Sequence, residues 1–376
     1  MSYTLVADQA GFAAALARAA ASGSVALDTE AASFHRYHDR VYLIQLTAAG
    51  ETTVIDPLPL TDLSPLGALL ADPAVEKLFH DADYDLRLLH HQFGFVSRHL
   101  FDTRVAAQLL GEPGIGLGTL LEKYFQIRPD KRFQRADWSA RPLTGPMLDY
   151  AAGDTMHLHE LQSVLLSQLI EKNRLAWAEE EFALQEEGAR WEPGEDDPRE
   201  SFLRFKGARA LDRRGLAILR ELHVWRETLA STLDRATFRL LGNEAILELA
   251  AQPVRTREQL AKVKGVGRDL AERRGAELLE AIERGLAVPE PELPRFERGP
   301  RRPPPDPEFD ARLERLKARR NAIAERLGLL PGVLCPNATL EAIARAVPDS
   351  VEAMRGLPGL REWQRREFGA ELISVL

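Results

Sequence analysis

The chain has 376 residues, of which 45% are hydrophobic and 28% are charged. This length predicts more than one domain, and this composition is typical of globular rather than disordered proteins. The sequence contains no apolar run of 18 residues, so we expect no transmembrane helix and no membrane partner. The single cysteine, Cys335, excludes an internal disulfide and a cysteine zinc cluster, and it predicts a reducing, cytoplasmic setting.

The formal net charge of −8 is unevenly distributed along the chain. Residues 1–200 contain 17 Lys+Arg and 31 Asp+Glu, whereas residues 201–376 contain 32 and 26. An acidic part that binds cations, followed by a basic part that meets phosphates, would produce this asymmetry. On charge alone, a chance distribution of solvated charge is the simpler explanation.

The first 60 residues predict a set of strands around one helix. The expected elements are a strand over residues 3–6, an amphipathic helix within 9–21, and strands over 24–27, 41–46 and 52–55. A hairpin connection over residues 48–51 joins the last two strands. This order predicts an antiparallel meander at the start of a mixed sheet.

Residues 60–190 predict helices with one inserted strand. Helices are expected over residues 63–70, 80–93, 103–110, 115–124 and 148–170, and the strand over residues 77–79. Asp102 is the expected N-cap of the third of these helices. The alternation of strands and helices predicts an α/β domain over residues 1–190.

Two segments interrupt all periodicity and predict linkers, residues 191–204 and the proline-rich residues 289–307. The sequences on either side of the second linker repeat each other at an offset of 94 residues. At this offset Arg226 matches Arg320, Asn243 matches Asn337, and the segment 275–278 matches 369–372 residue for residue. The repeat predicts a duplicated all-helical domain, with copies over residues 205–288 and 308–376.

Two carboxylates follow directly on the apolar strand that contains Leu27. Side chains alternate along a strand, so Asp28 and Glu30 point to the same face. Two like charges at the end of an apolar strand repel each other and resist desolvation. A divalent metal ion is the simplest counter-charge.

Further acidic residues occur at helical positions. Asp85 lies near the start of a helix, and Tyr150 and Asp154 are four residues apart on another helix, so they share a face. Taken singly, each has an ordinary explanation as a helix cap or a surface hydrogen bond. Asp81 and Asp83 crowd Asp85, so the choice among the three depends on which one faces the strand.

Taken together, these residues resemble the DEDD superfamily of 3′→5′ exonucleases, in its tyrosine-bearing branch. The Asp-x-Glu pair, the helical Asp and the Tyr-x-x-x-Asp motif of that family match the residues Asp28, Glu30, Asp85, Tyr150 and Asp154. The order of parts is similar to the bacterial ribonuclease D family, because the helical copies resemble its HRDC domains. Residues 43–46, 101–103 and 137–143 also resemble family sequence, so the resemblance spans nearly the whole chain.

The resemblance implies a ribonuclease H-like mixed sheet with flanking helices, an α/β fold, followed by two all-α HRDC-like helical bundles. It implies two divalent ions, Mg²⁺ or Mn²⁺, held by Asp28, Glu30, Asp85 and Asp154, with Tyr150 positioning the attacking water. The implied reaction removes nucleoside 5′-monophosphates from the 3′ ends of RNA, tRNA precursors above all. Two alternatives remain: a DNA 3′→5′ exonuclease, and a non-catalytic nucleic-acid-binding adaptor on the same fold.

Basic residues in two places are candidate contacts for nucleic acid. They are Arg128, Lys131, Arg132 and Arg135 in the loop over residues 126–141, and Lys262, Lys264 and Arg268 in the first helical copy. The second copy lacks these lysines, so we expect the first copy to bind nucleic acid better. The alternative is that both copies are packing or partner modules. Phe34, Tyr84 and Phe133 are candidates for base stacking, although core packing is the commoner role.

Overall fold

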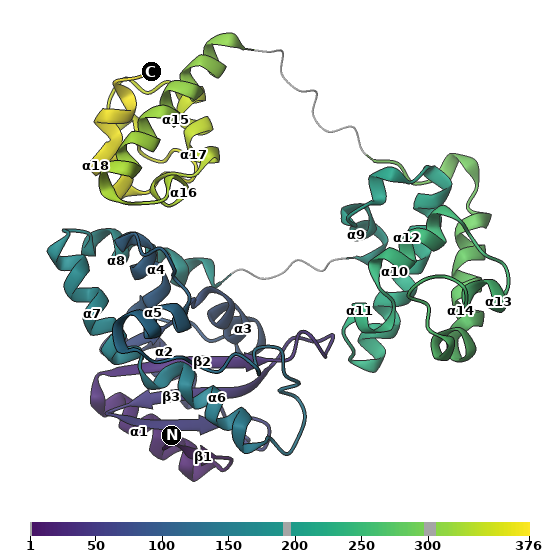
Figure 1. The fold of residues 1–376 in the computed structure, drawn as a ribbon, viewed down its shortest axis with the longest axis horizontal. Helices are drawn as coiled ribbons and strands as arrows, with labels where there is room; N and C mark the ends of the chain where they lie inside the picture. Colours follow the sequence, from purple (N-terminus) through teal and green to yellow (C-terminus); the bar gives the residue numbers. More distant parts are fainter. Residues whose placement is uncertain (1, 191–196, 297–305) are drawn as a thin grey trace.

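The computed structural model describes residues 2–190, 197–296 and 306–376. It contains an α/β domain in residues 2–190, a first helical module in residues 197–296 and a second helical module in residues 306–376 (Figure 1). This order of a mixed sheet with flanking helices and two all-helical parts confirms the predicted fold class. Within the described ranges, no helix combines the length and the apolar character needed to cross a bilayer.

One six-stranded mixed sheet forms the centre of the α/β domain, in the order β1-β4-β3-β2-β5-β6. Its strands are β1 (Thr4–Val6), β2 (Ser24–Ala31), β3 (Val41–Ala48), β4 (Glu51–Ile55), β5 (Glu76–Phe79) and β6 (Leu100–Asp102). Strands β2, β3 and β4 pair antiparallel, as predicted, and the other pairings are parallel. The prediction of a single strand after residue 60 was wrong, because β6 adds a second one. Three residues are too few to show a strand periodicity.

Strand β2 lies in the middle of the sheet, between β3 and β5. Val25, Ala26 and Leu27 are all buried although they alternate between faces, because helices cover both faces of the sheet here. Strand β2 pairs with β5 only from Ser24 to Ala26. Beyond Ala26 the edge of β2 that faced β5 is available to other groups, and the carboxylates gather at this point.

Eight helices surround the sheet (Figure 1). They are α1 (Gln9–Ser22), α2 (Ser64–Ala71), α3 (Asp83–Phe93), α4 (Thr103–Leu110), α5 (Leu117–Phe125), α6 (Gly145–Met156), α7 (Leu158–Glu171) and α8 (Leu175–Gly188). The prediction of one long helix over residues 148–170 was wrong. His157 leaves the helical conformation, with φ −112° and ψ 10°, and separates α6 from α7. The break lets α6 pack on β2, β3 and β4 while α7 packs on α4 and β5.

The first helical module is built around the long helix α10. Its elements are α9 (Pro198–Ser201), η1 (Phe202–Arg204), η2 (Ala208–Ala210), α10 (Arg213–Leu233), α11 (Thr237–Leu240), α12 (Asn243–Ala251), α13 (Arg257–Leu260), α14 (Arg268–Ala287) and η3 (Glu290–Glu292). Part of the segment expected to be linker is therefore ordered, and Phe202 belongs to the core of this module. The rest of that segment, residues 191–196, lies outside the described residues.

The second helical module repeats this plan around α15. Its elements are α15 (Pro307–Leu327), α16 (Pro331–Leu334), α17 (Asn337–Ala346), η4 (Glu352–Met354) and α18 (Glu362–Ile373). Of the expected proline-rich linker, residues 297–305 lie outside the described residues. Before them, Leu293 is buried and Phe296 packs against the core of the first module.

The two modules share an internal hydrogen-bonded arginine. In the first, Arg226 donates to the Leu241 carbonyl and to Asn243 Oδ1 over 3.2 and 2.7 Å. In the second, Arg320 donates to the Cys335 carbonyl and to Asn337 Oδ1 over 2.9 and 2.8 Å. Both guanidinium groups are buried. In both modules the arginine therefore connects the long helix, α10 or α15, to the start of the helix α12 or α17.

The second module packs tightly on α8 of the α/β domain. The rings of Trp177 and Trp363 stack with centroids 4.6 Å apart. Glu180 accepts hydrogen bonds from the backbone N–H groups of Glu362 and Trp363, over 2.6 and 2.8 Å, and so caps α18 from the neighbouring domain. Glu181 accepts from the Trp363 indole over 2.9 Å. One continuous hydrophobic core runs through both parts.

A glycine makes this contact possible at α4. Gly111 ends α4 with φ +80°, a conformation that favours glycine. A Cβ atom at this position would lie 2.0 Å from the backbone oxygen of Gly328. The two backbones therefore approach too closely for any side chain at residue 111.

Replacing Trp363 with alanine should weaken this interface. The substitution removes a buried indole, its ring stack and its hydrogen bond. We therefore expect the free energy of unfolding of the second module to fall by about 3–5 kcal/mol. Urea unfolding followed by near-ultraviolet circular dichroism measures the loss. Arg366→Ala on the exposed side of the same helix is the matched control and should change little. Equal urea midpoints for Trp363→Ala and Arg366→Ala would contradict the stabilising role of the Trp363 ring.

Candidate active site

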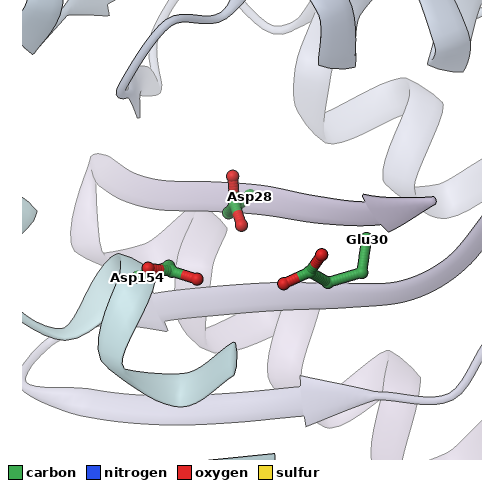
Figure 2. A group of neighbouring side chains, drawn as sticks. All are labelled: Asp28, Glu30 and Asp154. Atoms are coloured by element: carbon green, nitrogen blue, oxygen red, sulfur yellow. The ribbon is translucent and has the colours of Figure 1, made fainter. Parts of the chain in front are cut away.

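Three carboxylates converge where β2 ends (Figure 2). Asp28 and Glu30 come from one face of β2, and Asp154 comes from α6, which packs against this strand. One ligand oxygen from each residue can be chosen so that all three lie within 4.8 Å of one another. The structure therefore brings these three residues, which the sequence singled out, into one group. Their spacing suits a shared cation.

Tyr150 lies one helical turn before Asp154, and both side chains line the same cleft. The ring of Tyr150 packs against Trp138 and Phe133, with centroids 6.0 and 6.1 Å away. Trp138 is fully buried in this cluster. Burial and the nearby carboxylates raise the pKa of the Tyr150 hydroxyl, which keeps its proton and its role as a donor.

Asp85 approaches the site from the free edge of β2. The backbone N–H of Thr29 donates to Asp85 Oδ1 over 3.1 Å, and the Thr29 hydroxyl donates to the same oxygen. Asp85 is buried and, among its neighbours, is the strongest electrostatic influence on Asp28. It stands outside the group of three whose oxygens lie closest together. Thr29 is thus a site residue that the sequence did not single out.

The two aspartates that crowd Asp85 in the sequence are each paired with an arginine, and Asp81 also lines the cleft that contains Asp28. Asp81 forms an ion pair with Arg104, and Asp83 forms one with Arg87 one turn along α3. All four side chains are substantially exposed. Of the three aspartates, Asp85 is the one that points into the protein toward Thr29.

Asp102 holds the start of α3 in place. Its side chain caps α4, as predicted, by accepting from the backbone of Arg104. The same carboxylate accepts from the backbone N–H groups of Asp81 and Ala82 over 3.0 and 2.8 Å. Gln185 of α8 donates to it as well. Asp102 therefore fixes the turn from which Asp85 projects, and this second role depends on strand pairing that no local pattern reveals.

The four carboxylates are held in an environment that opposes their ionisation. Burial, followed by repulsion from the other carboxylates, raises the pKa values of Asp28 and Glu30 well above their usual range. Burial raises the pKa of Asp85 and the pKa of Asp154 to about 7 each. The charges that act on Asp28, Glu30 and Asp154 are all carboxylates. The cluster consists of the buried Asp85 and three half-buried carboxylates, and its charge is uncompensated within the described part of the chain.

The donor set fits a divalent cation. Hard cations such as Mg²⁺ bind carboxylate oxygens, and the charge of a cation would remove the repulsion that raises these pKa values. Gln45 adds a neutral polar group, since it pairs with Asp28 across β2 and β3 and is completely buried. Neither amide atom of Gln45 has a hydrogen-bond partner among the described residues. By composition and geometry, these residues could hold a divalent metal ion.

Asp28, Glu30 and Asp154 open into a cleft of about 590 Å³, and the buried Asp85 is not part of its lining. The other residues along its walls include His80, Tyr84, the start of α5, and the cationic loop. Lys131 and Arg135 of that loop line the cleft. Arg128 and Arg132 do not, because they form exposed ion pairs with Glu122 and Asp130.

The basic residues predicted in the first helical module lie elsewhere. Lys262, Lys264 and Arg268 are exposed between α13 and the start of α14. They are absent from the described lining of the cleft. Any contact they make with nucleic acid would be remote from the carboxylates.

Comparison with known protein families agrees with this geometry. Residues 3–170 match the 3'-5' exonuclease family, and residues 215–282 and 309–376 each match the HRDC domain family. Ribonuclease D of Gluconacetobacter diazotrophicus is 35% identical over 354 residues, covering 93% of this chain and 87% of the relative. Ribonuclease D of Zymomonas mobilis is 31% identical over 385 residues, covering 100% and 94%.

Solved structures show the same architecture. Escherichia coli RNase D, described as an exoribonuclease involved in structured RNA processing, has a TM-score of 0.71 and 25% identity, covering 100% of this chain and 99% of that one. A protein from Bifidobacterium adolescentis has a TM-score of 0.84 and 24% identity, which supports the fold. On these matches, the chain belongs to the ribonuclease D family and is a 3′→5′ exoribonuclease.

Proposed function

We propose that the chain shortens structured RNA from its 3′ end by two-metal-ion hydrolysis with Mg²⁺ or Mn²⁺, releasing nucleoside 5′-monophosphates. The observation that carries this proposal is the convergence of Asp28, Glu30 and Asp154, with Asp85 behind them, without a compensating positive side chain among the described residues. Tyr150 completes the five-residue set.

Each residue has a distinct task in this scheme. Asp28, Glu30 and Asp154 would supply oxygen ligands, and Thr29 fixes the orientation of Asp85 behind them. Bound divalent cations would make the attacking water more acidic and stabilise the leaving 3′-oxygen. The Tyr150 hydroxyl, which lines the cleft beside Asp154, would orient that water. Lys131 and Arg135 would hold phosphates of the entering strand.

The proposed physiological substrates are tRNA precursors with 3′ extensions. The support is the family membership and the relative from Escherichia coli that processes structured RNA. The proposed setting is the cytoplasm, supported by the single cysteine, which is buried and unpaired.

A tRNA precursor with a labelled 3′ extension tests the proposal directly. We expect labelled 5′-monophosphates to appear first and one at a time, in Mg²⁺ or Mn²⁺ and not in EDTA, with slower cutting of a DNA strand of matched sequence. Chromatography of the products against 5′- and 3′-monophosphate standards gives the result. Oligonucleotide products, 3′-monophosphates or unchanged activity in EDTA would contradict the mechanism, and equal rates on DNA would contradict the preference for RNA.

A further inference from the structure

The first helical module reaches the cleft through the connection between β2 and β3. Asp234, the C-cap of α10, accepts hydrogen bonds from the backbone N–H groups of Tyr37 and His38 over 3.2 and 2.9 Å. The backbone N–H of Ala236 donates to the carbonyl of His35 over 3.0 Å. Figure 1 shows α11 on this side of the module. These contacts fix the position of α11 beside the cleft.

This contact brings together two exposed aromatic rings from different domains. Phe34 and Phe238 meet edge to face with ring centroids 6.3 Å apart. They remain 41% and 53% exposed, unlike a pair that serves a hydrophobic core. Phe34 also lines the cleft that contains Asp28, Glu30 and Asp154. The ring pair therefore borders the catalytic cleft.

Guanidinium groups surround the ring pair. The Arg135 guanidinium lies 4.9 Å from the centroid of Phe34, and that of Arg239 lies 5.9 Å from the centroid of Phe238. Arg239 also donates to the backbone oxygen of Phe34. Exposed aromatic rings beside fixed positive charges match the requirements of a single-stranded nucleic acid, which offers base faces and phosphates together.

The second helical module lacks these groups at the same place. At the offset of 94 residues, Phe238 corresponds to Gly332, Arg239 to Val333 and Asp234 to Gly328. The corresponding surface of that module packs on the α/β domain near Gly111 instead. The aromatic and basic character is thus particular to the first copy and unnecessary for the fold of the module.

We propose that Phe34 and Phe238 form a cross-domain subsite that stacks an unpaired base upstream of the 3′-terminal nucleotide, with Arg135 and Arg239 contacting its phosphates. The inference rests on the proposed function and adds a binding site to it. A base can enter this subsite only from a single strand, so the subsite makes cutting depend on an unpaired 3′ extension. It acts on binding of the strand and leaves the hydrolytic step unchanged.

Variants of the two rings test the subsite when they are compared on two substrates. One is an unpaired RNA decamer, and the other is the p-nitrophenyl ester of a nucleoside 5′-monophosphate, which has no upstream base. For Phe34→Ala and Phe238→Ala we expect the KM for the decamer to rise about 10-fold, within the range for one base–aromatic stack. For Phe238→Ala, whose ring lies outside the cleft lining, the kcat and the hydrolysis of the ester should stay unchanged. Leu233→Ala, an exposed apolar residue of the same module, is the matched control.

An abasic nucleotide placed in turn at each position of the decamer maps the subsite. The natural protein should lose affinity at one upstream position, and Phe238→Ala should be insensitive at that position while keeping its response elsewhere. The proposal would be overturned by an unchanged KM for the decamer in both ring variants. It would also be overturned if Phe238→Ala lost activity equally on the decamer and on the ester. Failure of the natural protein to hydrolyse either substrate would instead contradict the proposed function.

Discussion

Replacing Asp28 with asparagine should lower the rate of RNA hydrolysis on the order of 10³-fold or more, while RNA binding is largely kept. Asparagine preserves the shape of the side chain and removes one charged ligand from the cluster of three carboxylates. The cleft wall, including Lys131 and Arg135, is unaffected. Single-turnover cleavage and filter binding in Mg²⁺ measure the two quantities separately.

Asp83→Asn is the matched control for this experiment. It removes a carboxylate of the same type, but one that forms an exposed ion pair with Arg87. We expect nearly natural activity from it, because exposed ion pairs contribute little. Asp28→Asn with natural activity would sink the metal-ligand assignment. Loss of both activity and binding would point to misfolding, which circular dichroism of the variant checks.

The metal-free protein should lose stability as the pH rises from about 4 to about 7. Burial raises the pKa of Asp85 and the pKa of Asp154 to about 7 each, whereas an aspartate in an unfolded chain titrates near pH 3.9. Between these values the unfolded state has released protons that the native state still holds. Folding is then disfavoured by up to about 1.4 kcal/mol per pH unit for each such group.

Divalent cations should reverse this trend. A cation favours the ionised carboxylates, and protons compete with it less as the pH rises, so Mg²⁺ or Mn²⁺ should stabilise the protein most above pH 7. Thermal unfolding in EDTA and in Mg²⁺ across this pH range measures both effects. Asp154→Asn should flatten the pH dependence in EDTA, because it removes one raised carboxyl. A melting temperature in EDTA that is independent of pH would contradict the electrostatic description.

Much of the site could be predicted because its residues lie in strong local patterns. Asp28 and Glu30 follow a buried strand, and Tyr150 and Asp154 share a helix face, so strand and helix periodicity place them. Asp85 was harder to identify from the sequence, because Asp81 and Asp83 lie at the same helix start. The choice depends on the edge of β2 left free where β5 ends, which is a property of the sheet.

Other features were beyond any local pattern. The sequence of residues 148–170 favours a helix throughout. The break at His157 arises because α6 and α7 pack on different elements. Thr29, an ordinary strand residue in the sequence, gains a role only when Asp85 arrives from 56 positions away. Arg128 and Arg132 were indistinguishable from Lys131 as loop cations until their acidic partners were placed.

The contact between Asp234 and the backbone of residues 37 and 38 has a consequence for how this protein can be dissected. The anchored loop begins directly after β2, so a few residues separate the carboxylate of Glu30 from the docked module. A fragment that stops before residue 197 would lose these contacts near its carboxylate cluster, so we expect its activity to understate that of the domain in the whole chain.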